Sequence, residues 1–214
     1  RLVERRYEDL VKGGALLDDA GKARLIAITG ELAGKFAEFS KRVLADEESY
    51  ILFTDPAEVA GIPESSLSAM KATAEAKGLK GWAATNTRSV MQPFLENCTN
   101  RDSRKKVFTA FAMRGDNNDA NDTSGIIADI LQLRQERAAL LGYENHAHYR
   151  MSNTMAKTPA AAMDLMMRVW PAAVARVKEE VADMQAVADR EAAAGKGSKV
   201  PMLQLDYRSK ITIE

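Results

Sequence analysis

Two histidines stand two residues apart in the segment ENHAHYR, at His146 and His148, and the chain has no others. Closely spaced histidines are common zinc ligands, so a metal site is the first chemistry to consider. On a helix, residues two apart point about 200° apart around the axis, whereas helical zinc sites use spacings of three or four residues, as in HExxH. The segment lies between helical patterns, and carboxylates would have to supply the remaining ligands. We therefore interpret both histidines as helix-surface residues.

The segment DNNDANDTSG (116–125) alternates Asp and Asn in a manner similar to a calcium-binding loop. An EF-hand loop requires Gly at its sixth position and a bidentate Glu at its twelfth. Counted from Asp116, these positions hold Asn121 and Ile127, and the register that starts one residue later fails as well. The segment is therefore predicted to be a turn followed by a helix cap.

The remaining nucleophiles show no catalytic signature. Cys98 is the only cysteine, and no recognisable motif flanks it, so we expect an inert thiol. The serines form no GxSxG elbow, and the glycines form neither GxGxxG nor a Walker loop. From the residues themselves we assign no catalytic, cofactor-binding or metal-binding residue to this chain. A single cysteine also excludes an internal disulfide and fits a reducing compartment, so we expect a cytoplasmic protein.

Methionines gather near the start of the last long helical pattern. Met163, Met166 and Met167 stand at helical spacing beside Leu165 and Trp170. Such a cluster is more often part of a core than a binding groove, and we interpret it as core. The groove remains the alternative.

The charge balance gives little indication of a charged partner. The chain has 30 Lys and Arg and 30 Asp and Glu, so its formal net charge is zero. This balance gives no electrostatic reason to expect nucleic acid or an anionic membrane as partner. No apolar run approaches the roughly 20 residues of a membrane span.

The composition and the hydrophobic periodicity predict an all-α fold, a multi-helix array of antiparallel helix pairs. The first two helices are expected to pair with each other, and Pro171 is expected to kink or break the last one. The segments YILFT (50–54) and GWAATNT (81–87) are candidates for one short two-stranded ribbon. Helices are predicted at residues 2–12, 19–46, 63–78, 89–97, 102–113, 123–142, 144–154 and 159–194.

The chain is predicted to divide near its end. Residues 1–195 form the helical portion, and residues 196–214 form a connector, which begins in GKGSK, and an atypical tail. The first residue already lies inside a helical pattern, so we expect the natural N-terminus to lie upstream of it.

A long segment, residues 118–159, resembles the thimet-oligopeptidase family of zinc metallopeptidases, and within it the bacterial peptidyl-dipeptidases of the Dcp type. Further similar segments are EVAGIPESSL (58–67), GLKGW (78–82) and NRDSRKKVFTAFAMRG (100–115), so that the resemblance covers about residues 1–195. The residues that match the family pattern are Asn121, Asp122, Leu133, Arg134, Ala138, Leu140 to Tyr143, Ala147, Tyr149 and Met155 to Pro159.

The resemblance implies a large, mostly helical peptidase whose two halves enclose a deep channel. In that family, two His of HExxH and a Glu on a following helix hold zinc, and this chain contains no HExxH. The chain is therefore expected to be the non-catalytic helical part, which forms one wall of the channel. Zinc would belong to the full-length enzyme, and no cofactor is expected on this chain.

The expected partners follow from the same resemblance. They are the missing catalytic half and an oligopeptide substrate, from which the full-length parent would remove C-terminal dipeptides. The alternative is a naturally truncated homologue that acts as a helical binding or self-association module. In the tail, LDYRSK (205–210) keeps only part of a WDWRYY-like family segment and then departs from it.

Overall fold

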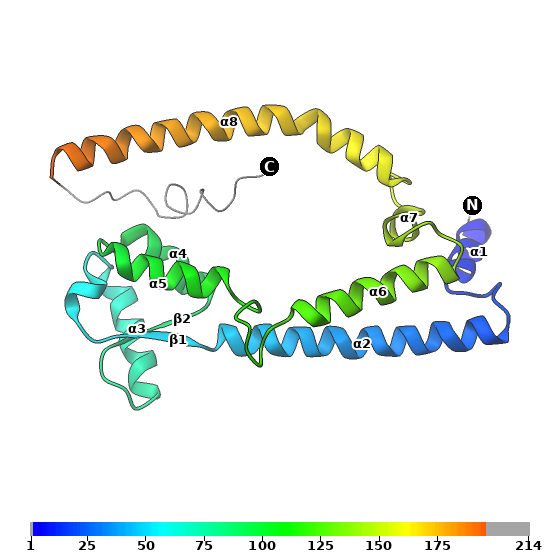
Figure 1. Ribbon diagram of the computed structural model, residues 1–214, viewed down its shortest axis with the longest axis horizontal. Helices are drawn as coiled ribbons and strands as arrows, with labels where there is room; N and C mark the ends of the chain where they lie inside the picture. The colour runs from blue at the N-terminus through cyan, green and yellow to red at the C-terminus, as the bar shows by residue number, and fades with distance from the viewer. Residues whose placement is uncertain (1, 196–214) are drawn as a thin grey trace. The chain divides into compact units, whose positions relative to one another are not determined.

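The computed structural model describes residues 2–195, without the side chains of residues 191 and 192. Within this range the chain is mostly helical, with one short antiparallel ribbon, which confirms the predicted fold class (Figure 1). The predicted connector and tail, residues 196–214, lie outside the described residues. The elements are α1 (Leu2–Lys12), α2 (Asp19–Glu47), β1 (Tyr50–Phe53), the 3-10 turn η1 (Pro56–Val59), α3 (Glu64–Ala76), β2 (Trp82–Thr85), α4 (Arg88–Asn97), α5 (Arg101–Ala112), α6 (Ser124–Leu140), α7 (His146–Met151) and α8 (Pro159–Ala193).

The chain divides into two compact units. The first contains the chain up to Arg42 together with Thr123–Pro171. The second contains Val43–Asp122 and the part of α8 that follows Pro171. Each unit has its own hydrophobic core.

The first unit is built on an antiparallel pair formed by α2 and α6 (Figure 1). Arg24 Nε lies 2.6 Å from Glu136 Oε1, and Lys35 Nζ lies 2.6 Å from Asp129 Oδ2. Residue numbers rise along α2 as they fall along α6, so these ion pairs mark the antiparallel register. The core between the helices consists of Ile28, Leu32, Ile126, Ile130 and Leu133.

The predicted pairing of the first two helices is wrong, because the partner of α2 in this core is α6. Helix α1 has no buried residue, and its Leu2 and Val3 are 74% and 80% exposed. A short connection favours pairing of sequence neighbours, but α6 offers α2 a larger β-branched apolar face at greater sequence distance.

The second unit contains the ribbon, as predicted. β1 pairs with β2 antiparallel, with Phe53 opposite Trp82. The Phe53 ring stacks on Phe94 of α4 at a centroid distance of 5.2 Å, inside the core of this unit. Gly81 enters β2 at φ +116°, and a Cβ there would lie 2.2 Å from the Phe53 carbonyl oxygen, so only glycine fits.

Local signals set several helix starts. Asp55 caps η1 by accepting a hydrogen bond from the Ala57 amide at 2.9 Å. Pro63 occupies the N-cap of α3, one residue before its predicted place, and α3 begins at Glu64. Differences of one residue at a helix end are within the usual spread of helix boundaries.

Candidate functional site

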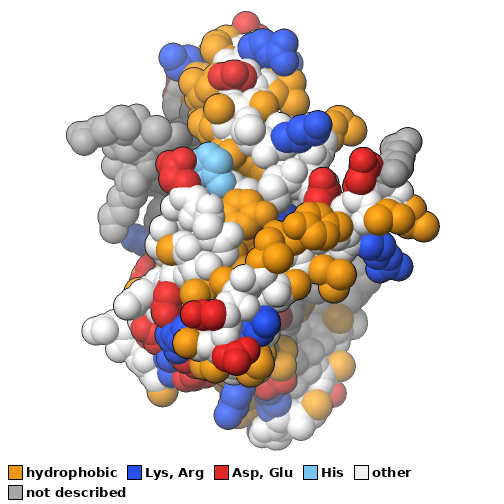
Figure 2. Space-filling model, turned by 90° about the vertical axis from the view of Figure 1, so that its right-hand side faces the viewer, with side chains coloured by type: hydrophobic (Ala, Val, Ile, Leu, Met, Phe, Trp, Pro, Cys, Tyr) orange, Lys and Arg blue, Asp and Glu red, His pale blue; other side chains and the backbone are white. Residues whose placement is uncertain are grey.

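The two histidines lie on α7, as predicted, and their rings have separate surroundings. His148 Nδ1 lies 3.0 Å from Asn145 Oδ1, and its Nε2 lies 3.5 Å from Glu144 Oε2. His146 Nδ1 is buried without a hydrogen-bond partner among the described residues. In the space-filling view histidine reaches the surface beside an acidic side chain (Figure 2). Burial lowers the pKa of His146, and the positive charges of Arg134, Arg137 and Arg150 lower it further.

The residues that the structure describes bring no zinc-ligand set together. A helix places His146 and His148 on different sides, so one ion cannot bind both. Among the residues that the structure describes, no three His, Cys, Asp or Glu side chains are placed to share an ion. A tetrahedral zinc site needs such a set of ligands.

Tyr149 of α7 connects three helices of the first unit. Lys12 Nζ of α1 lies 5.1 Å from the centre of its ring, and Arg137 Cζ of α6 lies 5.2 Å from it. Tyr143 meets the same ring edge-on at 5.4 Å, and Lys12 Nζ also donates a hydrogen bond to Asn153 Oδ1 at 2.9 Å. Tyr143 and Tyr149 belong to the segment that resembles the peptidase family, and in this structure they hold α7 by packing and cation–π contacts.

The acidic loop at 114–122 is organised by a carboxylate outside it. Asp46, at the end of α2, is 6% exposed. It accepts hydrogen bonds from the Gly115 amide at 2.7 Å, from Asn117 Nδ2 at 3.1 Å and from Asn121 Nδ2 at 3.2 Å. These contacts lie within the second unit, and they make Asp46 a positioning residue of the loop.

Acidic groups of the loop itself accept amide hydrogen bonds. Asp122 Oδ2 accepts from the Asn118 amide at 3.0 Å, and Asp119 Oδ1 accepts from the Asn121 amide at 2.8 Å. Asn118 has φ 55°, a left-handed conformation that asparagine tolerates in turns. The predicted turn is therefore confirmed, and Thr123 is the N-cap residue of α6, although its side chain makes no cap bond to the helix.

Cys98 is buried, with 4% of its surface exposed. Its thiol donates weakly to the Glu58 carbonyl oxygen at 3.4 Å, and burial raises its pKa. A reactive cysteine needs an accessible, stabilised thiolate, and these surroundings favour the neutral thiol. The expectation of an inert thiol agrees with this geometry.

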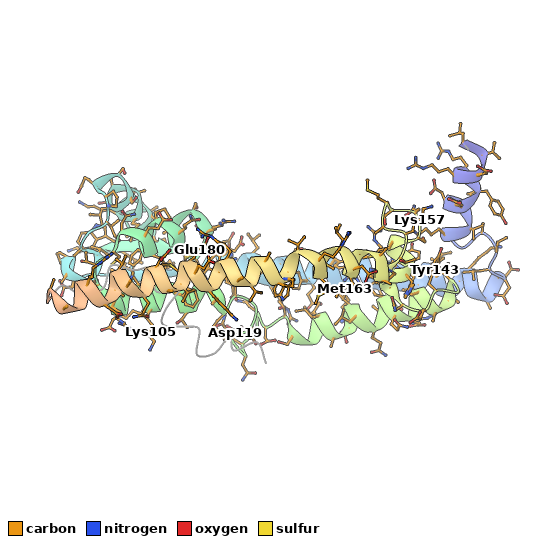
Figure 3. All side chains as sticks on the ribbon, turned by 90° about the horizontal axis from the view of Figure 1, so that it is seen from above. Lys105, Asp119, Tyr143, Lys157, Met163 and Glu180 are labelled. Carbon is orange, nitrogen blue, oxygen red and sulfur yellow. The ribbon has the colours of Figure 1, made fainter. Side chains whose placement is uncertain are left out.

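An exposed apolar surface lies on the first part of α8. Met163, Met166, Met167 and Trp170, here called the methionine face, are 50%, 54%, 55% and 53% exposed. They stand at positions i, i+3, i+4 and i+7, which share one side of a helix. Met163 is labelled on α8 in Figure 3. The interpretation of this cluster as core is wrong for the described residues, because spacing indicates a shared side but not what covers it.

Two charged side chains border the methionine face on one side. Asp164 and Arg168 line a shallow hollow on α8 together with Ala161 and Met167. Asp164 and Arg168 stand four residues apart, so they lie on the same side of the helix, and their carboxylate and guanidinium groups border one edge of the methionine face.

Helix α8 continues through Pro171, where a kink or break was predicted. Proline has no amide hydrogen, so the Met167 carbonyl receives no hydrogen bond from position 171. None of the helices in residues 2–195 is both long and apolar enough to cross a bilayer.

Comparison with known proteins identifies the family to which these elements are similar. The sequence profile of peptidase family M3 matches residues 94–207. Dipeptidyl carboxypeptidase of Escherichia coli K12 is 36% identical over 193 residues, which cover 89% of this chain and 28% of that protein. Oligopeptidase A of the same organism is 34% identical over 171 residues, which cover 76% of this chain and 25% of that protein.

A plant relative shows a similar extent of matching. Organellar oligopeptidase A of Arabidopsis thaliana is 32% identical over 206 residues, which cover 91% of this chain and 25% of that protein. The chain thus spans about a quarter of the length of the curated relatives that it matches.

Proposed function

The chain belongs to peptidase family M3, and on that premise we propose that it forms one wall of the channel in which a peptidase of this family holds its oligopeptide substrate. The single observation that carries the proposal is the methionine face, an apolar helix surface that is half exposed. The parent enzyme, in this proposal, removes C-terminal dipeptides in the cytoplasm, and its zinc is held by residues outside this chain.

The chemistry of the methionine face suits peptides of varied sequence. Methionine has three rotatable bonds and a polarisable sulfur, so a methionine surface adapts to different apolar side chains. Trp170 adds a large, rigid contact area. The neighbouring Asp164 and Arg168, which lie at one edge of this face, can attract charged groups of the peptide. The wall would therefore bind the peptide without fixing its sequence.

The test uses the two tryptophans as reporters. The chain has Trp82 in the second unit and Trp170 on the methionine face, so incorporation of 5-fluorotryptophan gives two ¹⁹F signals. On titration with short oligopeptides, the Trp170 signal should shift saturably and the Trp82 signal should not. Trp170→Phe assigns the signals.

A pair of variants gives the test its specificity. Met166→Glu places a charge on the methionine face and should weaken peptide binding roughly tenfold or more, since burial of a methionine stabilises by about 1.5–3 kcal/mol. Leu165→Glu makes a similar change at a position that is 57% exposed and points away from that face. Equal peptide affinities of the two variants, or no shift of the Trp170 signal in the unsubstituted chain, would refute the proposal.

The second candidate function is self-association through the same surface. Exposed apolar patches of several large side chains mark interaction sites, and a second copy could cover this one. Sedimentation velocity over a range of concentrations distinguishes the two roles. A dimer that Met166→Glu dissociates and Leu165→Glu preserves, with no peptide binding, would favour the self-association module.

A further inference from the structure

A small cavity opens in the second unit where α3, β2 and α4 meet. Its volume is about 130 Å³. Four buried side chains line it, which are 6%, 4%, 1% and 1% exposed: Ile62, Met70, Ala83 and Phe94. Ala69 of α3 and Ser89 of α4, both exposed, line it as well and place its mouth at the surface. The cavity therefore connects the core of this unit to solvent.

Small side chains account for the hollow. Ala83 on β2 and Ala69 on α3 each contribute only a methyl group where longer side chains would fill the space. The Thr73 hydroxyl, also in the lining, donates a hydrogen bond to the Ala69 carbonyl oxygen at 2.9 Å. The Ser89 hydroxyl lies 3.1 Å from the Thr87 hydroxyl. The Ser66 hydroxyl is a third polar group of the lining, and the other lining side chains are apolar.

One acceptor in the lining lacks its regular helical donor. Pro93 lies inside α4, four residues after Ser89, and both residues line the cavity. Because proline has no amide hydrogen, the Ser89 carbonyl cannot receive the usual i+4 hydrogen bond. Ligand sites combine an apolar lining with a few polar groups, and the Ser89 carbonyl is the candidate for such a group at this cavity.

We propose that this cavity binds the tyrosine side chain of an oligopeptide, with the phenol O–H donating to the Ser89 carbonyl oxygen. Dry apolar cavities on the order of 150 Å³ take up benzene, so one ring matches the available space. The Phe94 ring in the lining offers an aromatic partner. The part of this inference that concerns peptides rests on the substrate-wall function proposed above.

The cavity is tested first with phenol and benzene, by following backbone amide signals of the whole chain in NMR titrations. Both should shift amides of α3 and α4 saturably, and phenol should bind roughly fivefold more tightly because of its hydrogen bond. Ala69→Leu fills the mouth and should abolish binding. Ala72→Leu is the matched control, since Ala72 is an exposed alanine of the same helix.

Each outcome decides a separate part of the inference. Absence of saturable shifts, or equal binding by Ala69→Leu and Ala72→Leu, would overturn the cavity as a site. Equal affinities for phenol and benzene would overturn the role of the Ser89 carbonyl. Each variant is folded if its amide signals outside α3 and α4 match those of the unsubstituted chain.

A second titration connects the cavity to peptides. Two oligopeptides that differ only by Tyr or Ala at one position are compared, and the Tyr peptide should shift the phenol-sensitive amides and compete with phenol. Failure to compete would refute the peptide part of the inference. The ¹⁹F shift of Trp170 on peptide addition reports the substrate-wall function separately. If Trp170 shifts but the Tyr peptide does not compete with phenol, the cavity's role in peptide binding has failed. If Trp170 does not shift, the substrate-wall function has failed.

Discussion

Replacement of Asp46 by alanine removes the acceptor that organises the 114–122 loop. The carboxylate is 6% exposed and accepts from Gly115, Asn117 and Asn121. Hydrogen bonds to a charged group are worth about 1.5–3 kcal/mol each, but the two asparagine amides can rotate towards water. The Gly115 amide is fixed by the backbone and stays buried without its acceptor. We therefore expect a loss of about 3 kcal/mol rather than the sum of three bonds.

The assay follows urea unfolding of the second unit through Trp82 fluorescence, in a Trp170→Phe background. Glu48→Ala is the matched control, because Glu48 is an exposed carboxylate two residues further along the chain. We expect the control to change the unfolding free energy by less than about 0.5 kcal/mol. If only the 114–122 loop opens, hydrogen exchange of the Gly115 backbone amide with solvent should accelerate roughly a hundredfold in Asp46→Ala. An Asp46→Ala variant no less stable than the control would refute the reasoning.

Three further predictions concern backbone and titration. Gly61→Ala should lower the free energy of unfolding by more than about 2 kcal/mol, because φ of Gly61 is +88° and a Cβ would lie 2.5 Å from the Asn97 carbonyl oxygen. Gly34→Ala should raise it by about 0.5–1 kcal/mol, because no atom lies within 4 Å of the added Cβ. Urea unfolding measures both changes. His146 should titrate below its ordinary pKa of 6.5 in an NMR pH series. The unfolded chain then takes up a proton that the folded chain does not, so stability should fall as pH decreases below about 6.5, and His146→Phe should reduce that fall. Cys98 should react slowly with a disulfide reagent until urea unfolds the chain, and rapid reaction of the folded chain would contradict its burial.

Local physical signals in the sequence predicted most elements of this fold. The 3.6-residue periodicity and the Gly and Pro positions indicated the helices, and the short apolar, partly β-branched run at 50–54 indicated a strand. The same signals could not predict that α2 packs on α6, because periodicity identifies an apolar side and not its partner. Packing between segments that are distant in sequence depends on shape and area, which one-dimensional spacing does not contain.

For the candidate sites too, the sequence predicted what depends on local geometry and not what depends on distant contacts. Spacing alone was sufficient to separate His146 and His148, because the geometry of a helix is fixed. Asp46 carried no signal, since an acidic residue near a helix end resembles a solvated one until its donors are known. The cavity beside Ala83 and Pro93 also left no mark in the sequence, because alanine in a strand and proline in a helix occur without hollows.

Pro171 has a consequence for how α8 behaves before anything binds it. Helix formation is cooperative, and an isolated helix shorter than roughly 12–15 residues is marginal in water. Residues 159–170, which carry the methionine face, are separated from the rest of α8 by a position that cannot donate its hydrogen bond. Any molecule that covers this face therefore also shifts a helix–coil equilibrium. The affinity of such a molecule includes the free energy of ordering residues 159–170 as a helix. Substitutions in this segment that raise intrinsic helix propensity should therefore tighten binding without contacting the ligand.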